Sequence, residues 1–386
     1  MAEPAAPALR LTRLTLSAFR NYAALTWQPA ARITAVFGPN GSGKTNLLEA
    51  ISLLTPGRGL RGARIPDLPQ HGATAWGIAG RFETPSGPSE IGTGSPPDTG
   101  DRADRRVFRL DGTAPRNQAE IAARVAAVWL TPQMDRLFLE AASGRRRFLD
   151  RLVYALEPSH AREISAFDTA MAQRNRLLGA EARDDAWLAA LEDAMARHAV
   201  AATAGRSALV RRLNAVLARG AIGAFPRADL GLLCPIADHL AGSPALTVED
   251  WLRAALAQAR RRDTAAGSAS LGAHRADLVL RDAETGTPAA SASTGQQKAL
   301  LIATVLGHAA LLQEARGFSP MLLLDEPAVH LDADRREALF TALLQLPAQV
   351  VMTGTDRAVF APLQGDAAGL RIDAATLSED PDFAHS

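Results

Sequence analysis

Cysteine and lysine are almost absent from this sequence of 386 residues. The single cysteine, Cys234, excludes a disulfide bond within the chain and a metal site built from cysteine pairs, and it is typical of proteins in a reducing cytosol. Only two of the 42 lysine and arginine residues are lysines, namely Lys44 and Lys298. Codon composition is enough to explain that bias, so the abundance of arginine does not by itself indicate nucleic-acid binding.

The sequence also lacks a strong net charge and long apolar runs. Because its formal net charge is only +1, a nucleic-acid surface would have to be a local patch. The longest apolar stretches, such as residues 300–312, are too short to cross a membrane, and residues 1–7 lack the basic and apolar segments of a secretion signal. We therefore expect a cytoplasmic protein, and its length and 47% hydrophobic residues predict a sizeable core with more than one lobe.

Residues 38–45 read Gly-Pro-Asn-Gly-Ser-Gly-Lys-Thr and match the phosphate-binding pattern G-x-x-x-x-G-K-[ST]. The apolar run 32–37 before them predicts a buried strand, and residues 45–54 after them carry apolar side chains at helical spacing. Such a loop binds phosphate through backbone N–H groups and a helix N-terminus. Lys44 would reach the β- and γ-phosphates and the Thr45 hydroxyl would hold Mg²⁺. The predicted nucleoside triphosphate contacts here are Gly38, Pro39, Asn40, Gly41, Ser42, Gly43, Lys44, Thr45 and Asn46.

Two carboxylates follow the apolar run 321–324, which predicts a second buried strand. Asp325 would hold Mg²⁺ through water, and Glu326 would activate the hydrolytic water as general base. The alternative is that these acids cap the next helix. Gln133, just past an expected strand at 125–130, would sense Mg²⁺ or the attacking water. The predicted catalytic residues are thus Lys44, Glu326 and Gln133, and the predicted metal-site residues are Thr45, Asp325 and Gln133.

The segment Ser-Thr-Gly-Gln at 293–296 opens an apolar helix and resembles the signature of ABC ATPases. In those proteins this helix N-terminus binds the γ-phosphate of the nucleotide held by the other subunit; the alternative is an ordinary serine-capped helix. Because one chain has one phosphate loop and one signature, two complete sites require two chains. The sequence therefore predicts a two-fold homodimer with ATP at its interface. The expected contacts from this part of the chain are Ser293, Gly295, Gln296 and, in a segment that matches the D-loop, Asp332.

Two arginine-rich segments are candidates for phosphate contacts with DNA. For the first segment, which contains Arg58, Arg61 and Arg64, a solvated loop is the favoured alternative. The second segment, which contains Arg145, Arg146 and Arg147, would equally well brace a helical lobe. A third segment, residues 19–22, joins two expected strands and either brings an arginine to the nucleotide or is a plain polar hairpin tip. The candidates are Arg58, Arg61 and Arg64 for the first, Arg145, Arg146 and Arg147 for the second, and Arg20 and Asn21 for the third.

The order of these segments predicts an α/β fold, a P-loop NTPase with an ABC/SMC-like ATPase head. Residues 1–130 and 268–386 would form the head. Residues 131–267 are mainly helical in pattern and lack sustained heptads, so they would form an inserted lobe with at most a short hairpin arm. Residues 84–100, rich in proline, glycine, serine and threonine, are expected to form a long exposed loop.

Several motifs taken together resemble the RecF family, the bacterial recombination-mediator ATPases of the SMC-like ABC class. The matches run from about residue 9 to residue 355, and the arginine run and the His-Arg-x-Asp segment are more specific than the phosphate loop. The matching segments are residues 19–22, 45–50, 145–150, 173–175, 274–277 and 293–297.

This resemblance implies an ABC head with an inserted helical lobe, ATP-dependent dimerisation on DNA, and slow, DNA-stimulated hydrolysis of ATP with Mg²⁺. It also implies action at single-strand gaps and at junctions of single-stranded and duplex DNA. There the family works with RecR and RecO to help load RecA. We therefore expect a nucleoid-associated protein of the cytoplasm.

The sequence departs from the family at two places, residues 325–326 and residue 276, and from transporter ATPases at a third, residues 353–355, where it fits the family. Asp325-Glu326 stands where many members carry two aspartates, and it supports catalysis. Residues 353–355 lack the switch histidine of transporter ATPases, which implies slow turnover. Ala276 replaces the first of two aspartates in many members, so the role of that motif stays open.

Three other functions compete with a DNA clamp. One is the nucleotide-binding subunit of an ABC transporter, but the long separation between Lys44 and Ser293 favours an SMC-like head. A chromosome-bridging SMC protein would need a much longer coiled coil than residues 131–267 supply. A non-enzymatic DNA-binding module would bind DNA normally after Lys44→Ala.

Overall fold

The computed structural model describes residues 9–96, 105–180, 184–220 and 225–384. The chain divides into two compact units, of which the first comprises residues 1–135, 220–226 and 294–386 and the second comprises residues 136–219 and 227–293. Residues 268–293 therefore belong with the helices of the second unit, whereas the domain boundaries expected from the sequence gave them to the head. Residues 1–7, on which the expectation about secretion rests, lie outside the described residues.

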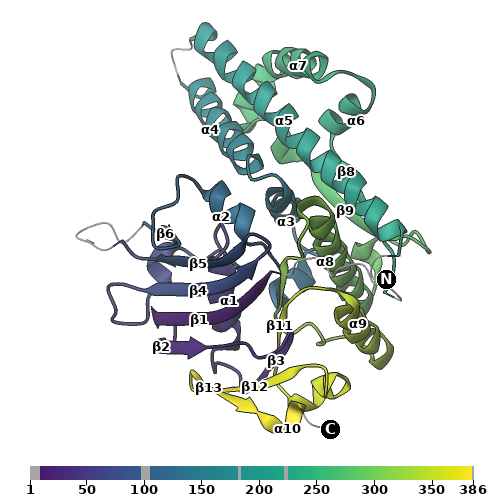
Figure 1. Ribbon diagram of the computed structural model, residues 1–386. Helices are drawn as coiled ribbons and strands as arrows, with labels where there is room; N and C mark the ends of the chain where they lie inside the picture. The colour runs from purple at the N-terminus through teal and green to yellow at the C-terminus, as the bar shows by residue number, and fades with distance from the viewer. Residues whose placement is uncertain (1–8, 97–104, 181–183, 221–224, 385–386) are drawn as a thin grey trace. The chain divides into compact units, whose positions relative to one another are not determined.

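A six-stranded sheet forms the centre of the first unit (Figure 1). Five of its strands are parallel, and the edge strand β13 runs antiparallel to β12. All residues of β3, β10 and β11 are buried, as in sheets whose two faces are both covered. In order, the strands are β13 (Thr376–Asp380), β12 (Ala368–Asp373), β3 (Ile33–Phe37), β11 (Val350–Gly354), β10 (Met321–Leu324) and β7 (Ala127–Leu130).

Helices complete the core of the first unit. Helix α8 is buried without interruption from residue 297 to residue 309, so the apolar stretch that begins at residue 300 is a core helix. Within the described residues, no helix is both long and apolar enough to span a membrane. The helices of this unit are α1 (Lys44–Leu53), η1 (Ile65–Asp67), α2 (Gln118–Arg124), η2 (Pro132–Arg136, which ends at the first residue of the second unit), α8 (Thr294–Arg316), α9 (Ala333–Gln345), η5 (Arg357–Leu363) and α10 (Pro381–Ala384).

A second sheet of the first unit is antiparallel, and it corrects one expectation. Part of the expected loop at 84–100, residues 87–94, is strand β5, which pairs with β4 on one side and β6 on the other. Residues 97–100 of that loop lie outside the described residues. In order, the strands are β2 (Tyr22–Trp27), β1 (Arg10–Phe19), β4 (Gly77–Thr84), β5 (Gly87–Gly94) and β6 (Val107–Leu110).

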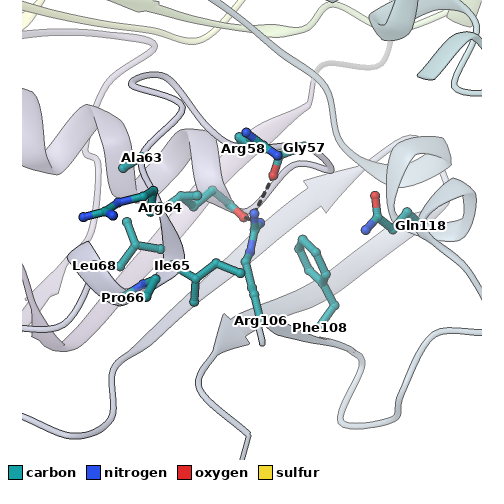
Figure 2. A pocket seen from close by; sticks show the side chains of 11 residues that line it. Gly57, Arg58, Ala63, Arg64, Ile65, Pro66, Leu68, Arg106, Phe108 and Gln118 are labelled. Atoms are coloured by element: carbon teal, nitrogen blue, oxygen red, sulfur yellow. Dashed lines mark hydrogen bonds between the residues drawn. The ribbon is translucent and has the colours of Figure 1, made fainter. Parts of the chain in front are cut away.

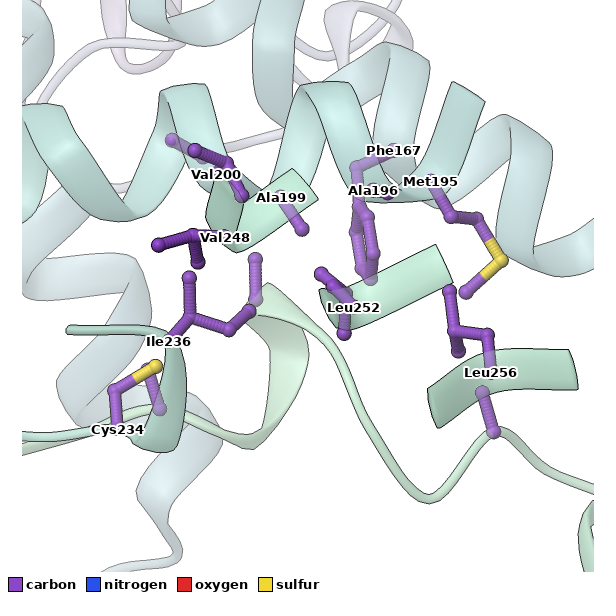
Figure 3. Packing of buried hydrophobic residues seen from close by; sticks show 14 of the residues in the cluster. Phe167, Met195, Ala196, Ala199, Val200, Cys234, Ile236, Val248, Leu252 and Leu256 are labelled. Atoms are coloured by element: carbon purple, nitrogen blue, oxygen red, sulfur yellow. The ribbon is translucent and has the colours of Figure 1, made fainter. Parts of the chain in front are cut away.

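The second unit is mainly helical, as predicted, but it also contains a two-stranded sheet. Its core lies along the long helix α5, where Met195, Ala196 and Val200 pack against Val248 and Leu252 of α7 (Figure 3). The elements are α3 (Ala142–Leu156), α4 (His160–Leu178), α5 (Asp185–Ala218), β8 (Ala228–Leu233), α6 (Pro235–Gly242), α7 (Ala245–Ala266), η3 (Ala273–Arg275), β9 (Asp277–Asp282) and η4 (Ala289–Ser291).

A buried charge cluster ties three helices of this unit together. Arg174 of α4 has no exposed side-chain surface, and its guanidinium donates to Glu192 of α5 at 2.9 Å and to Asp263 of α7 at 2.8 Å. A third donor reaches the carbonyl oxygen of Leu256 at 2.8 Å. Since burying an unpaired charge is costly, these contacts fix α4, α5 and α7 in one arrangement. Arg174 belongs to one of the segments that resemble the RecF family.

Candidate functional site

The phosphate loop connects the carboxyl end of β3 to α1, and this strand–loop–helix order agrees with the sequence prediction. Gly38, Gly41 and Gly43 have φ angles of 154°, 80° and 116°, which side chains rarely adopt. A Cβ atom on Gly38 would lie 2.0 Å from the carbonyl oxygen of Ile372, and one on Gly43 would lie 2.8 Å from the Tyr22 hydroxyl. The backbone of the loop therefore requires glycine at both places.

Lys44, the first residue of α1, is buried beneath this loop with 6% of its surface exposed. Its ammonium donates to the carbonyl oxygens of Gly38 at 2.7 Å and Pro39 at 2.9 Å. Burial lowers the pKa of Lys44, and the nearby carboxylates of Glu326 and Asp325 oppose that shift. The lysine and the two acids, far apart in the sequence, thus act on one another in one site.

Three oxygen-bearing side chains meet at the carboxyl ends of the parallel strands. The Thr45 hydroxyl donates to Asp325, with its oxygen 3.0 and 3.1 Å from the two carboxylate oxygens. The Thr353 hydroxyl, at the end of β11, donates to Asp325 Oδ1 at 2.7 Å and accepts from the backbone N–H of Glu326 at 3.0 Å. Asp325 is 4% exposed. The fold therefore brings Thr45, Asp325 and Thr353 together, next to the backbone of Glu326.

Glu326 has an unusual backbone conformation. Its φ angle is 51°, a left-handed value that costs a non-glycine residue about 1–3 kcal/mol. The alternative in which Asp325 and Glu326 cap the next helix is wrong, because α9 begins at Ala333 and its N-cap is Asp332. A strained conformation at the end of a buried strand is typical of functional sites. This finding supports the catalytic interpretation of Glu326.

The turn between β1 and β2 lies against the phosphate loop. The Asn21 amide donates to the carbonyl oxygen of Ser42 at 3.1 Å and accepts from Asn46 at 2.7 Å, and the Tyr22 hydroxyl donates to the carbonyl oxygen of Gly43 at 3.0 Å. Burial raises the pKa of Tyr22, which keeps its hydroxyl protonated as a donor. The turn is therefore more than a polar hairpin tip, because its side chains hold the backbone of the phosphate loop.

Arg20, in the same turn, is held by α1. It makes two hydrogen bonds with the carboxylate of Glu49, at 2.9 and 2.8 Å, and the Glu49 side chain is 1% exposed. Arg61 donates to Asn46 at 2.7 Å and lies 3.3 Å from Glu49. Arg20 and Arg61 thus brace α1, and a contact of Arg20 with nucleotide stays a prediction.

The signature residues open α8, and the D-loop residue caps α9. Ser293 and Gln296 are exposed at the start of α8. A Cβ atom on Gly295 would lie 2.9 Å from the carbonyl oxygen of His330, so this turn packs closely against the segment that leads to Asp332. Asp332 accepts from the backbone N–H of Arg335 at 2.8 Å. Gln133 lies on η2 with its side chain exposed, and its role stays a prediction.

The arginine-rich loop borders an open depression of about 610 Å³ in the first unit. Figure 2 shows Arg106 inside it, near Phe108 and Gly57. Arg106 lies 4.3 Å from the ring centre of Phe108 and donates to the carbonyl oxygen of Gly57 at 2.5 Å, so it holds the loop in place. Arg64 forms an ion pair with Asp67 at 3.1 Å, and Arg58 is exposed at the rim. Contact of these arginines with DNA stays a prediction.

Two of the three arginines in the run at 145–147 serve the second unit itself. Arg145 donates to both carboxylate oxygens of Asp277, at 2.7 and 2.9 Å, and Arg146 donates to the carbonyl oxygen of Ala276 at 3.0 Å. The Arg145 pairing raises its pKa through the hydrogen bond to Asp277. Arg147 is exposed. This run therefore joins α3 to β9, and with them the arginine run to the His-Arg-x-Asp segment.

Two residues of the site were missed in the sequence analysis. Thr353 was noted only for the absence of a histidine, yet its hydroxyl links Asp325 to Glu326. Lys298 donates to Asp135 and to the carbonyl oxygen of Glu326, each at 3.0 Å. The sequence offered one signal for each residue. Thr353 stands at the end of a parallel strand, and Lys298 is one of only two lysines.

Comparisons with known proteins agree with this geometry. The family model described as RecF/RecN/SMC N terminal domain matches residues 10–367. The chain is 46% identical over 374 residues to the DNA replication and repair protein RecF of Mesorhizobium japonicum. The matched region covers 96% of this chain and 98% of that protein. It is 45% identical over 352 residues to the protein of that name from Rhizobium meliloti, covering 91% and 93% of the two chains.

Solved structures show the same fold. A structure of the recombination mediator protein RecF with ATP, in the RecFOR pathway, has a TM-score of 0.83 at 20% identity and covers 98% of this chain and 100% of that one. The Smc head domain of Pyrococcus furiosus has a TM-score of 0.52 at 14% identity, with 96% of each chain covered. These likenesses confirm the predicted α/β, SMC-like head fold. The chain belongs to the RecF family of DNA replication and repair proteins, as its sequence motifs predicted.

Proposed function

We propose that this chain is an ATP-dependent DNA-binding ATPase that dimerises on ATP at single-strand gaps and at junctions of single-stranded and duplex DNA. In this proposal it hydrolyses ATP slowly and acts with RecR and RecO to support the loading of RecA during recombinational repair and replication restart. The observation that carries the proposal is the convergence of Lys44, Thr45, Asp325 and Glu326 at one edge of the parallel sheet. Membership of the RecF family supports the DNA-repair role.

The oxygen atoms at this edge fit Mg²⁺. The metal commonly takes one or two protein oxygen ligands and completes its octahedron with water and phosphate. The Thr45 hydroxyl and the Asp325 carboxylate are within hydrogen-bond distance of each other, so these two residues would hold the cation together. When bound, Mg²⁺ would neutralise charge on the β- and γ-phosphates.

The remaining chemistry falls to side chains of this chain. Lys44 exchanges its bonds to the carbonyl oxygens of Gly38 and Pro39 for phosphate oxygens and stabilises the negative charge that develops on them. Glu326 takes a proton from the attacking water as general base. Thr353 keeps Asp325 and the Glu326 backbone in register through its two hydrogen bonds. Gln133 is proposed to position water or the metal.

The exposed signature supports the proposed dimer. Ser293 and Gln296 lie at the exposed start of α8, where backbone N–H groups suit a phosphate. In the proposed dimer they bind the γ-phosphate of the nucleotide held by the partner, with Asp332 at the interface. ATP then favours the closed dimer because it binds that state better than the open one, and hydrolysis releases it.

The competing functions have less support. The RecF relatives cover nearly the whole chain, including its second unit, which does not favour the transporter alternative. A non-enzymatic DNA-binding module would not require a buried lysine between the phosphate loop and two carboxylates. DNA binding is proposed to be electrostatic, with the exposed Arg58 as the first candidate.

DNA affinity tests this proposal directly. We expect wild-type protein to bind a gapped duplex more tightly with ATP and Mg²⁺ than without, and to lose at least about tenfold in affinity between 50 and 200 mM salt. Lys44→Ala should lose the ATP-dependent increase because its phosphate loop cannot hold the γ-phosphate. The measurement is fluorescence anisotropy of labelled DNA.

The control is Arg81→Ala, which removes an equal charge from an exposed ion pair with Glu90. It should leave the ATP effect intact. If Lys44→Ala binds DNA as tightly as wild type in the presence of ATP, the chain is a DNA-binding module and not an ATP switch.

A further inference from the structure

Lys298 is one of only two lysines in the chain, and the other is the phosphate-loop lysine. In a sequence that uses arginine almost everywhere else, this position keeps a compact ammonium that points donors in three directions. The side chain is 1% exposed. Because a buried charge is tolerated only when it is paired and hydrogen-bonded, its partners define its role.

Those partners come from two separate segments near the candidate site. Lys298 Nζ donates to Asp135 Oδ2 at 3.0 Å and to the backbone carbonyl oxygen of Glu326 at 3.0 Å. Asp135 lies on η2, two residues after Gln133. Lys298 itself lies on α8, one helical turn beyond the signature. One ammonium thus joins the signature helix α8, the turn after β10 and η2.

The bond to Glu326 holds a strained residue. The N–H of Glu326 donates to the Thr353 hydroxyl, and its carbonyl accepts from Lys298 at 3.0 Å and from the backbone N–H of Val329 at 3.4 Å. Both backbone polar groups of this residue are therefore held by a side chain, and the Lys298 bond is the shorter of the two to the carbonyl. With a φ of 51°, Glu326 keeps its conformation only if its surroundings enforce it. The direction of its carboxylate therefore depends on these bonds.

We infer that Lys298 is a positioning residue that fixes the backbone of Glu326 and couples its placement to the signature helix α8. The close packing of Gly295 on the His330 carbonyl supports this coupling, because it joins α8 to the segment that follows Glu326. The inference rests on the proposed function, in which Glu326 is the general base and the signature binds the partner's nucleotide. It assigns no contact between Lys298 and nucleotide.

The test separates ATP binding from the hydrolysis step. Lys298→Met keeps an unbranched side chain, one atom shorter than that of lysine, and removes both hydrogen bonds. We expect the maximal hydrolysis rate to fall at least about tenfold, because the general base is misplaced, while the Kd for ATP stays within about threefold of wild type. The matched control is Arg316→Met on the same helix, which removes a bond to the carbonyl of Ala122 and should change neither quantity.

A double-mutant cycle with Glu326→Gln shows whether Lys298 acts through Glu326. In the Glu326→Gln background, Lys298→Met should lower the residual rate by less than about twofold. If it lowers the rate by the same factor in both backgrounds, or leaves the wild-type rate unchanged, the inference is wrong. If Glu326→Gln alone hydrolyses ATP at the wild-type rate, the general base of the proposed function has failed instead.

A second variant covers the possibility that Lys298→Met leaves the half-buried Asp135 without its ion pair and does not fold. The double variant Lys298→Met/Asp135→Asn removes the uncompensated charge as well as the lysine. It should fold, bind ATP within about threefold of wild type, and still lose at least about tenfold in hydrolysis rate. Recovery of the rate in this variant would show that Lys298 serves folding only.

Discussion

Glu326→Gln is expected to lower the rate of ATP hydrolysis by at least about 100-fold, which is the usual contribution of a general base. The amide has the shape of the carboxylate but cannot take a proton from water. The fold should survive, since the Glu326 backbone is held by Thr353 and Lys298 and neither bond uses the carboxylate. ATP affinity should therefore stay within about threefold of wild type.

Single-turnover hydrolysis with gapped DNA present measures this effect without a contribution from product release. Glu337→Gln, an exposed glutamate of α9, makes the same chemical change away from the site and should hydrolyse ATP like wild type. A rate for Glu326→Gln within threefold of wild type would show that another group accepts the proton.

Replacing Arg174 with methionine is expected to destabilise the second unit by about 3–5 kcal/mol, the range observed when one partner of a buried ion pair is removed. Asp263 has no exposed side-chain surface and would lose its ion pair, keeping a bond from the N–H of Ser270. Glu192 would keep its pair with Arg260 at 2.7 Å. The loss should therefore fall mainly on the contact between α4 and α7.

Hydrogen exchange of the α4, α5 and α7 amides reports on this unit separately, which matters because two units need not unfold in one step. Arg197→Met is the control: Arg197 pairs with Asp193 on the surface, 54% and 38% exposed, and its loss should cost at most about 0.5 kcal/mol. Equal exchange rates in the two variants would mean that the buried cluster adds no stability.

The parallel part of the fold could be predicted from the sequence because burial on both faces leaves a continuous apolar run. The run 32–37 became β3 (Ile33–Phe37), and 321–324 became β10. Strand β5 could not be predicted in this way, since Gly-Pro-Ser-Glu-Ile-Gly-Thr-Gly has little intrinsic preference for a strand. It is a strand because β4 and β6 pair with it on both sides.

The residues of the candidate site that belong to a sequence motif could be predicted. The residues that reach the site only through the fold could not. Lys44, Thr45 and Asp325 belong to patterns whose spacing indicates their chemistry. Thr353 and Lys298 reach the site only because β11 lies next to β10 and because α8 packs on the turn after β10. Their contacts depend on tertiary structure and cannot be predicted from a local sequence pattern.

The oligomeric state of Glu326→Gln with ATP and Mg²⁺ tests the central claim most directly. We predict a dimer with ATP, a monomer without it, and a monomer that still binds ATP when Ser293→Arg is added to block the signature. Light scattering after size exclusion, at matched concentrations and with gapped DNA present or absent, distinguishes these states. If Glu326→Gln stays monomeric at high concentration with saturating ATP and DNA, the ATP-bridged dimer is contradicted, and only a nucleotide site remains.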